Sequence, residues 1–322
     1  MMKIAIMGKI HPDGLEIFNK NNIENYEIDS FDDQDLAIKL SDVDGIVIRT
    51  ASLNSKILSK CKNLKIVSRH GVGYDNVDSN YLSNNHIALA ITGTSNSVSV
   101  AEHVMTMFLY LTKKINLSNN LVKSGNFKKK SELPDFFELY QKNILIVGFG
   151  RIGQELAKRC LGFDMNVYVH DPFVSEKLIV SKGCININKE EGLKIADYIS
   201  IHVPLNDKTK NFISFKEFDL TKNNLILVNT ARGGIIHEEA LLDALKKNKI
   251  NSAGLDVFEN EPPIENHPFF KEDNILLSPH NAALTLECRK RMSVEACENV
   301  LNFLTNDSNL NKDNIINLKF LI

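Results

Sequence analysis

Residues 143–160, NILIVGFGRIGQELAKRC, decide the fold class of the chain. The apolar run at 144–147 is typical of a buried parallel strand, and the apolar spacing that follows predicts an amphipathic helix. Gly148, Gly150 and Gly153 lie at the turn between them. Glycines there permit a tight bend, a close approach of backbone to a pyrophosphate, and close packing of the helix on the strand. The stretch therefore predicts a dinucleotide-binding unit that begins in mid-chain; an ordinary βα turn is the alternative.

The residues after this turn indicate which dinucleotide would bind. Arg151 and Ile152 open the predicted helix, whose first N–H groups lack partners within the helix and would bind phosphate. The next predicted strand, NVYVHD, ends in Asp171. A carboxylate at this place accepts hydrogen bonds from the adenosine ribose and repels a 2'-phosphate. We therefore expect the cofactor to be NAD, bound by these residues and the three glycines.

Composition excludes several classes of function. The formal charge of the 322 residues is −2, so nothing indicates the one-sided basic surface that binds nucleic acid or an anionic membrane. No segment approaches the ~20 apolar residues of a membrane span, and the N-terminal apolar run is too short for a signal peptide. The five cysteines are widely spaced and form no CxxC pair, which is typical of reduced thiols rather than of a metal site. We expect a cytoplasmic protein without nucleic-acid or membrane partners.

Two series of alternating strand and helix patterns predict two α/β domains. The first series predicts a parallel sheet of about five strands. From residue 142, the second predicts a complete doubly wound sheet of about six strands. The last helical pattern, at 285–304, returns the chain to the first domain. We expect a flavodoxin-like substrate-binding domain of residues 1–95 plus 285–322, an inserted Rossmann NAD-binding domain of residues 96–284, and a cleft between them for a small-molecule substrate.

A long helical pattern at 98–111 is apolar on nearly every side. Such a helix has to be buried all round. We interpret it as a crossing between the domains that also contributes to a homodimer interface. A core helix buried within one protomer is the alternative.

Polar side chains follow three strands of the second predicted sheet, at the edge where open α/β folds bind ligands. Arg232 follows NLILVNTA, Glu261 lies in the loop ENEPP after AGLDVF, and His280 follows ILLSP. Taken alone, each has an alternative interpretation. The Arg could contact cofactor phosphate or pair structurally, the Glu could be a solvated turn residue, and the His could be a cap or a core residue.

Together, these side chains are sufficient for hydride transfer at a hydroxyl-bearing carbon. The Arg232 guanidinium would hold a substrate carboxylate bidentately and polarise the oxygen on C2. Imidazole groups exchange protons near neutral pH, so His280 would exchange the proton of that oxygen. Glu261 would bond the other ring nitrogen and stabilise the imidazolium, while the nicotinamide would carry the hydride.

A series of motifs resembles the D-isomer-specific 2-hydroxyacid dehydrogenases over nearly the whole chain: GFGRIG, HDP, NTARGGIIHEEAL, GLDVFENEP and SPH. The resemblance implies that the Arg, Glu and His just described are the catalytic set. It also implies that Asp256, in GLDVF, lies near the nicotinamide amide. In RHGVGYDNVD, it implies that backbone N–H groups around Val72 and Gly73 bind the substrate carboxylate.

Within this family, GIVIRTASLNSKIL is most similar to the D-3-phosphoglycerate dehydrogenases, in which a basic residue at the position of Arg49 meets the substrate phosphate. The implied substrate pair is 3-phosphoglycerate and 3-phosphohydroxypyruvate, as in serine biosynthesis. A structural ion pair is the alternative for Arg49. A general 2-keto acid or hydroxypyruvate reductase is the alternative enzyme, and an NAD-sensing corepressor-like protein is the alternative outside the enzymes.

The chain departs from the family pattern in its connections. Gln141 stands where the family usually has Gly before the strand, and Gly93 stands in a segment that usually carries Pro. Glu261 is the usual acid, whereas formate dehydrogenases of this superfamily carry Gln, which argues against formate. The sequence ends at Ile322 without room for the regulatory domain of long phosphoglycerate dehydrogenases. We therefore expect no serine feedback through such a domain.

Overall fold

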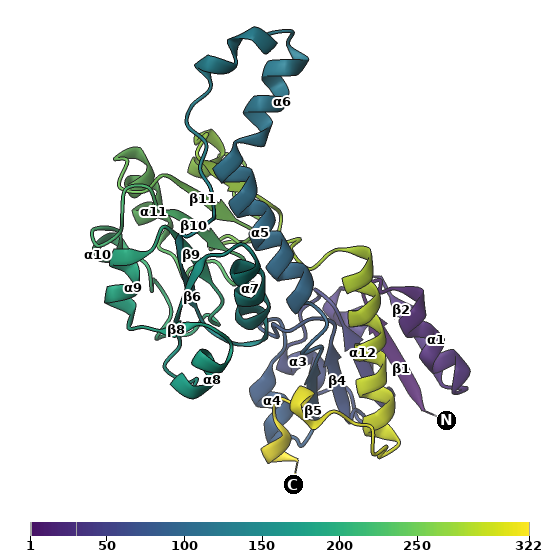
Figure 1. Ribbon diagram of the computed structural model, residues 1–322. Coiled ribbons are helices and arrows are strands. Elements are labelled where there is room, and N and C mark those ends of the chain that lie inside the picture. Colours follow the sequence, from purple (N-terminus) through teal and green to yellow (C-terminus); the bar gives the residue numbers. More distant parts are fainter. Residues whose placement is uncertain (1, 30, 322) are drawn as a thin grey trace. The chain divides into compact units, whose positions relative to one another are not determined.

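The computed structural model describes residues 2–29 and 31–321, and the chain divides into two compact units (Figure 1). Unit 1 comprises the residues up to Asn96 together with those from Leu284 onward, and unit 2 comprises Ser97–Ala283. Each unit is built around one parallel sheet with helices on both faces. The predicted fold class, α/β with two doubly wound parallel sheets, is confirmed.

Unit 1 contains a five-stranded sheet with the order β2-β1-β3-β4-β5. The strands are β1 (Lys3–Met7), β2 (Glu24–Ile28), β3 (Gly45–Ile48), β4 (Ile66–Arg69) and β5 (Ala88–Ile91). The helices are α1 (Pro12–Lys20), α2 (Asp33–Lys39), α3 (Ser55–Leu58), α4 (Ser79–Asn84) and α12 (Leu286–Leu304), followed by the 3₁₀ turns η3 (Lys312–Asn314) and η4 (Leu318–Phe320). This flavodoxin-like order reverses direction between β1 and β3, so their carboxyl ends flank the topological switch point.

Both faces of the unit 1 sheet are buried. On β1, Ile4 and Ile6 belong to a hydrophobic cluster with residues of α1 and α12. Ala5 and Met7, between and beyond them, belong to a second cluster with residues of α2, α3 and α4. Successive side chains of a strand point to opposite faces, which explains why these strands are apolar throughout. Helix α12 packs on α1, β3 and β4, so the C-terminal segment completes this unit (Figure 1).

Unit 2 contains a seven-stranded sheet with the order β12-β11-β10-β9-β6-β7-β8. The strands are β6 (Asn143–Val147), β7 (Asn166–His170), β8 (Ile185–Asn186), β9 (Tyr198–Ile201), β10 (Ile226–Asn229), β11 (Ser252–Leu255) and β12 (Ile275–Leu277). The helical segments are α5 (Ser97–Lys113), α6 (Ile115–Lys123), η1 (Phe127–Glu132), α7 (Arg151–Gly162), α8 (Glu176–Ser181), α9 (Lys189–Ile195), α10 (Phe215–Phe218), α11 (Glu238–Lys246) and η2 (Pro268–Lys271). Strand β8 was not expected, because its two residues are exposed and too few to produce a periodicity.

The unit 2 sheet is also covered on both faces. Ile144 and Ile146 of β6 pack in a cluster with residues of α5 and α7. Leu145 and Val147 pack in another cluster with residues of α9, α10 and α11. The switch point of this sheet lies between β6 and β9, because the chain runs from β6 towards β7 and β8 and then returns to β9. The carboxyl ends of β6 and β9 therefore flank the expected ligand position.

Helix α5 is less completely covered than its composition predicts. Residues such as Val104 and Phe108 are buried, and the helix packs against α7, β10 and β11. Val98 is exposed, and Leu109 and Leu111 are only half-buried. Figure 1 shows α6 and the following loop extending beyond the end of α5. Neither α6 nor η1 has a buried residue. We refer to residues 115–132 as the α6 arm.

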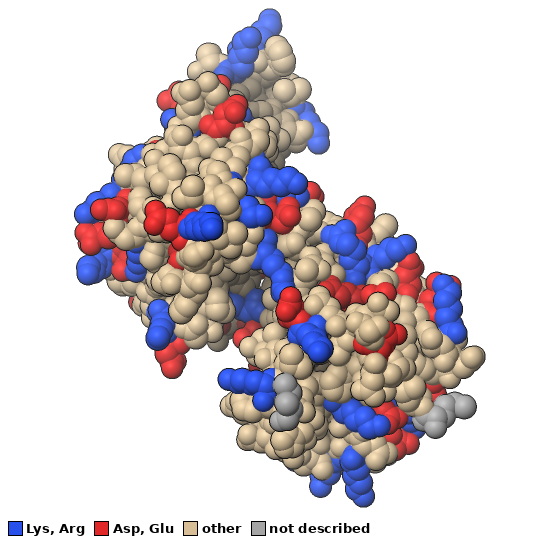
Figure 2. Space-filling view, turned by 60° about the horizontal axis from the view of Figure 1, so that its bottom comes forward, with Lys and Arg blue, Asp and Glu red and all other residues tan. Residues whose placement is uncertain are grey.

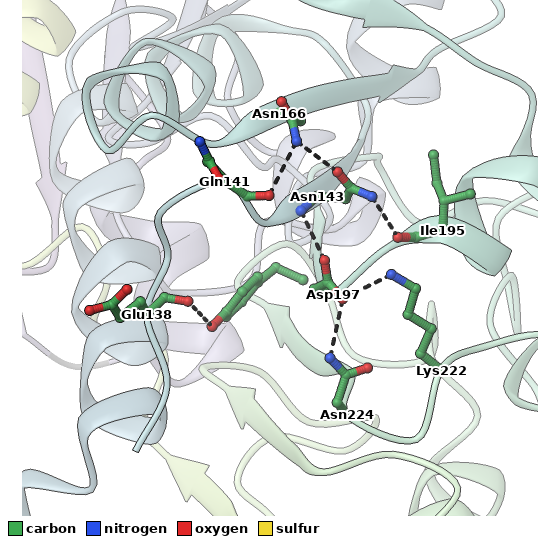
Figure 3. Close-up of polar contacts among 9 residues, drawn as sticks. Glu138, Gln141, Asn143, Asn166, Ile195, Asp197, Lys222 and Asn224 are labelled. Carbon is green, nitrogen blue, oxygen red and sulfur yellow. Dashed lines mark hydrogen bonds and ion pairs between the residues drawn. The ribbon is translucent and has the colours of Figure 1, made fainter. Parts of the chain in front are cut away.

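A polar network fixes the amino ends of the unit 2 strands, at the sheet edge opposite the glycine turn (Figure 3). The backbone N–H of Asn143 donates to Asp197 Oδ2 at 3.0 Å. Lys222 and Asn224 donate to the other oxygen of Asp197, at 2.9 and 3.1 Å. Gln141, just before β6, has a φ of +58°. Glycine adopts this left-handed conformation without the steric cost that Gln carries.

Candidate active site

The three glycines of the turn after β6 have separate structural roles. Gly148 has a φ of +95°, and a Cβ on it would lie 2.8 Å from the carbonyl carbon of His202. A Cβ on Gly153 would collide with the carbonyl oxygen of Gly148, so the start of α7 lies close to the turn. A Cβ on Gly150 would meet no protein atom within 4 Å. The turn thus combines a tight bend, close helix packing and open space above the backbone, which fits a bound pyrophosphate.

Asp171 directly follows β7 and is joined to the glycine turn by a hydrogen bond. Its Oδ2 accepts from the backbone N–H of Phe149 at 2.8 Å, and its Oδ1 accepts from that of Phe173 at 2.9 Å. Each oxygen retains a second lone pair that a ribose hydroxyl could use. Arg151 is exposed and Ile152 is half-buried at the start of α7. The glycine turn, the start of α7 and Asp171 are therefore adjacent, and their geometry fits NAD.

His202 was missed by the sequence analysis. It follows β9 at the switch point, and its Nε2 lies 2.8 Å from Ser200 Oγ. Burial lowers the pKa of His202 to about 3, so the ring is neutral. Its backbone carbonyl packs against Gly148. The signal that could have found it is HVP directly after an apolar strand, the same strand-end position that identified the other sites.

Arg232, Glu261 and His280 follow three neighbouring parallel strands, β10, β11 and β12. The structure brings Glu261 and His280 into direct contact: Oε2 of the carboxylate lies 2.7 Å from Nδ1 of the ring. The other carboxylate oxygen accepts the backbone N–H of Phe258 at 3.1 Å, which holds the acid in place. Both side chains are partly exposed, at 37% and 47%, so a ligand can reach the ring.

The turn that carries Arg232 is fixed against the loop that carries Glu261. A Cβ on Gly233 would collide with the backbone carbonyl of Phe258, so only glycine allows this approach. Asn229, the last residue of β10, donates from its side chain to the carbonyl oxygen of Arg232 at 2.8 Å. The Arg232 Nη1 donates to the carbonyl of Ala231 at 2.7 Å. Backbone contacts therefore hold the turn of Arg232 beside the loop of the Glu–His pair.

His280 has a φ of +51°, a left-handed conformation that is costly for a residue other than glycine. Asp256 is fully buried. Its carboxylate accepts the backbone N–H groups of the two residues that follow His280. Oδ1 accepts from Asn281 and Oδ2 accepts from Ala282, both at 2.9 Å. Strained backbone of this kind persists where the surroundings hold it firmly, as they do here.

The carboxylate of Asp256 has a further partner in the residue that follows β12. Its Oδ1 also accepts the hydroxyl of Ser278 at 2.5 Å, and that hydroxyl lies 3.0 Å from Nε2 of His103 on α5. The carboxylate is therefore directed at the loop of His280 and is not exposed. A direct contact with the nicotinamide amide stays a prediction. Ser278 and His103 were missed because no local pattern links them to Asp256.

Unit 1 contains the other expected site residues. The backbone N–H groups of Val72 and Gly73, in the loop after β4, carry no hydrogen bond to another residue of the described chain. Arg49 follows β3, and its Nη1 makes one long contact, 3.4 Å, with the carbonyl of Lys9. Within residues 2–29 and 31–321, Arg49 forms no ion pair with a carboxylate. The structural ion-pair alternative for Arg49 thus finds no partner there.

Within residues 2–29 and 31–321, no group of three or more His, Cys, Asp and Glu side chains is placed to hold a metal ion. None of the helices in this part of the chain is both long and apolar enough to span a membrane. Figure 2 shows Lys and Arg mixed with Asp and Glu over the face in view. All five cysteines are buried, and burial raises the pKa of the Cys61 and Cys184 thiols to about 11.

Comparison with known proteins gives consistent matches. Residues 105–282 match the family model described as D-isomer specific 2-hydroxyacid dehydrogenase, NAD binding domain. The chain is 33% identical to a D-3-phosphoglycerate dehydrogenase of Archaeoglobus fulgidus over 94% of its own length. It is 35% identical to a hydroxypyruvate reductase of Thermotoga maritima, covering 87% of this chain and 91% of that protein.

The match in length differs between these relatives. The chain spans between 57% and 60% of the length of three D-3-phosphoglycerate dehydrogenases, from Archaeoglobus fulgidus, Methanocaldococcus jannaschii and Bacillus subtilis. Among solved structures, the D-lactate dehydrogenase of Aquifex aeolicus in complex with NAD and lactic acid aligns with a TM-score of 0.84. That alignment has 27% identity and covers 97% of this chain and 98% of the other.

Proposed function

The chain belongs to the D-isomer specific 2-hydroxyacid dehydrogenase family, and we propose that it is an NAD-dependent dehydrogenase that transfers a hydride between the nicotinamide and C2 of a D-2-hydroxy acid. The observation that carries this proposal is the contact between Glu261 and His280, beside the Arg232 turn at the carboxyl edge of the unit 2 sheet. NAD fits the glycine turn and the Asp171 carboxylate, and it supplies the hydride when bound.

In the direction of reduction, the three side chains have separate roles. Nδ1 of His280 bonds Glu261, which leaves Nε2 to donate a proton to the oxygen on C2. Glu261 stabilises the imidazolium and holds the ring in this orientation. Arg232 polarises the same oxygen and binds the carboxylate of the 2-oxo acid, for which its planar fork is suited. In the direction of oxidation, His280 accepts the proton instead.

The proposed substrate pair is 3-phosphoglycerate and 3-phosphohydroxypyruvate. The relatives from Archaeoglobus fulgidus, Methanocaldococcus jannaschii and Bacillus subtilis are named D-3-phosphoglycerate dehydrogenases. Arg49 offers a guanidinium without a carboxylate partner in the described chain. The free N–H groups of Val72 and Gly73 support a role in binding the substrate carboxylate. Hydroxypyruvate is the alternative substrate, because a relative covering a similar length is a hydroxypyruvate reductase.

We also propose a homodimer formed through α5 and the α6 arm. Val98 on α5 is exposed, and on the arm Ile115, Val122 and Phe127 are exposed by more than half. Apolar side chains gathered in this way are typical of an interface between protein chains. Light scattering at several concentrations should give twice the mass of one chain, and a monomer at every concentration would contradict the homodimer.

The five buried cysteines are free thiols, which supports a cytoplasmic location.

Turnover with NADH and a panel of 2-oxo acids tests the proposed function. We expect 3-phosphohydroxypyruvate to give the highest kcat/KM, above hydroxypyruvate, glyoxylate and pyruvate. Arg49→Ala should raise KM for the phosphorylated substrate about 10- to 100-fold, the effect of losing a charge-assisted hydrogen bond. A wild-type preference for hydroxypyruvate would leave only the broader dehydrogenase assignment. NADH binding without any turnover would favour the corepressor-like alternative.

A further inference from the structure

A cavity of about 220 Å³ lies within unit 1, at the carboxyl ends of β1, β3 and β4. Lys9 and His11 line it from the loop after β1, Arg49 from the residue after β3, and His70 from the residue after β4. Arg289, from the first turns of α12, also lines the cavity. The cavity thus occupies the switch point between β1 and β3, where open α/β sheets bind ligands. Its volume exceeds the roughly 30 Å³ that one water molecule occupies in the liquid, so it has room for a group the size of phosphate.

The cations of this cavity are not neutralised by protein carboxylates. Within the described chain, neither Lys9, Arg49 nor Arg289 forms an ion pair, and the Arg49 guanidinium donates only to the carbonyl of Lys9. The nearby acid, Asp13, is paired with a lysine that does not line the cavity. Its Oδ2 lies 2.5 Å from Lys290 Nζ. Two guanidinium groups and one ammonium group therefore retain their charge for a ligand.

The hydroxyl of Ser293 on α12 joins three of the residues that line the cavity. Its hydroxyl donates to the carbonyl of Arg289 at 2.8 Å and accepts the backbone N–H of His11 at 2.9 Å. Nε2 of His70, which is 4% exposed, lies 2.9 Å from the same oxygen. Because the hydroxyl proton is already donated, the ring must donate from Nε2. The loop after β1, the residue after β4 and α12 are thus joined at one atom.

We propose that this cavity is a phosphate-binding subsite, and that Lys9 and Arg289 are specificity-determining residues that bind the terminal phosphate of the substrate together with Arg49. Guanidinium groups bind phosphate oxygens bidentately, and an ammonium group adds a compact point charge. A dianion matches this excess of positive charge better than a carboxylate does. The inference rests on the proposed function in one respect, namely that the phosphate belongs to a 2-oxo acid.

Kinetic measurements on Arg289→Gln and Lys9→Gln test the role in specificity. Arg289→Gln should raise KM for 3-phosphohydroxypyruvate about 10- to 100-fold, and Lys9→Gln should raise it less, because an ammonium is a weaker partner for phosphate. The fold-increase in KM for hydroxypyruvate should be at least five times smaller than the fold-increase in KM for 3-phosphohydroxypyruvate. Arg289→Lys should recover part of the loss. Lys60→Gln, which removes an exposed charge of unit 1 outside the cavity, should change neither KM. Equal effects of Arg289→Gln on the two substrates would overturn the proposal.

Binding of inorganic phosphate to the NADH-loaded protein, followed by calorimetry, separates this inference from the proposed function. We expect one phosphate to bind per chain, and Arg289→Gln to weaken it about tenfold or more while Lys60→Gln leaves it unchanged. Phosphate binding with this dependence, but without turnover of any 2-oxo acid, would support the subsite and contradict the enzyme. Turnover of 2-oxo acids, with phosphate binding that ignores Arg289→Gln, would overturn the subsite and leave the enzyme standing.

Discussion

Nδ1 of His280 lies 2.7 Å from Oε2 of Glu261, although the two residues come from the loops of different strands. A carboxylate at hydrogen-bond distance fixes which ring nitrogen faces the acid and which faces outward. It also stabilises the protonated ring. The pair therefore has the two properties needed of a group that donates a proton to a substrate oxygen and later recovers it.

The charge of Glu261 should contribute to the rate of reduction. Glu261→Gln keeps a hydrogen-bonding side chain but removes the negative charge that faces the His280 ring. Because proton donation from this ring then loses its charged partner, kcat/KM for reduction should fall about 10-fold or more, within the contribution of general acid catalysis. Glu259→Gln, an exposed neighbour, is the control and should keep the wild-type value. An unchanged kcat/KM for Glu261→Gln would separate the acid from the chemistry.

Asp171 should determine the choice between NADH and NADPH. Its carboxylate is held by the N–H groups of Phe149 and Phe173, so it cannot swing away from a 2'-phosphate. We expect kcat/KM to favour NADH in the wild type, and Asp171→Asn to reduce that preference about 10- to 100-fold, because it removes a charge. Glu176→Gln, on the next helix, should leave the preference unchanged. Equal use of both cofactors by the wild type would remove Asp171 from this role.

Gln141 should destabilise the native chain through its backbone. Its φ of +58° costs an L-residue roughly 1–2 kcal/mol, whereas glycine adopts it freely. Gln141→Gly should therefore raise the free energy of unfolding by about 1 kcal/mol, measured by urea denaturation. Gln141→Ala removes the same side chain but keeps the strain, so it should give no such gain. Equal effects of the two substitutions would show that the backbone conformation is not the cause.

His70 should make the stability of unit 1 depend on pH. Burial lowers its pKa to about 4, and the charges of Arg69 and Arg49 act in the same direction. As the pH falls below about 6.5, the unfolded chain takes up a proton that the folded chain refuses until about pH 4. The free energy of unfolding should fall across this window by up to about 1.4 kcal/mol per pH unit for this residue.

Comparing His70→Gln with the wild type in phosphate-free buffer measures this contribution, because a Gln side chain can still donate to Ser293. The substitution should make the decline between pH 6 and pH 4 less steep by about this amount. The exposed His86→Gln is the control. If His70→Gln and the wild type lose stability in parallel, His70 is not the group that titrates.

The sequence predicts the parts of the fold that depend on short patterns. The order strand, Gly148, helix and Asp171 identifies the cofactor unit because each of its requirements is local. Arg232, Glu261 and His280 could be grouped because parallel strands end at one sheet edge, so that a strand-end position already implies proximity. The same reasoning could have been applied to His202.

Such local patterns could not predict contacts between segments that are distant in the sequence. The motif around Asp256 did not predict that its carboxylate accepts the backbone N–H groups of Asn281 and Ala282, and its place near the nicotinamide amide stays a prediction. Lys9 and Arg289 approach one cavity only because α12 packs beside α1 and β4. The exposed side of α5 depends on the arrangement of the sheet beneath it, which its composition does not specify.

Turnover by His280→Ala tests the central claim most directly. We predict that kcat with NADH and the best 2-oxo acid falls about 10²- to 10⁴-fold, the contribution of a general acid, while the dissociation constant for NADH stays within threefold of the wild-type value. A loss of turnover with NADH still bound would place His280 in the chemistry itself. A near-normal rate for His280→Ala, under conditions in which the protein is folded and binds NADH, would contradict the account.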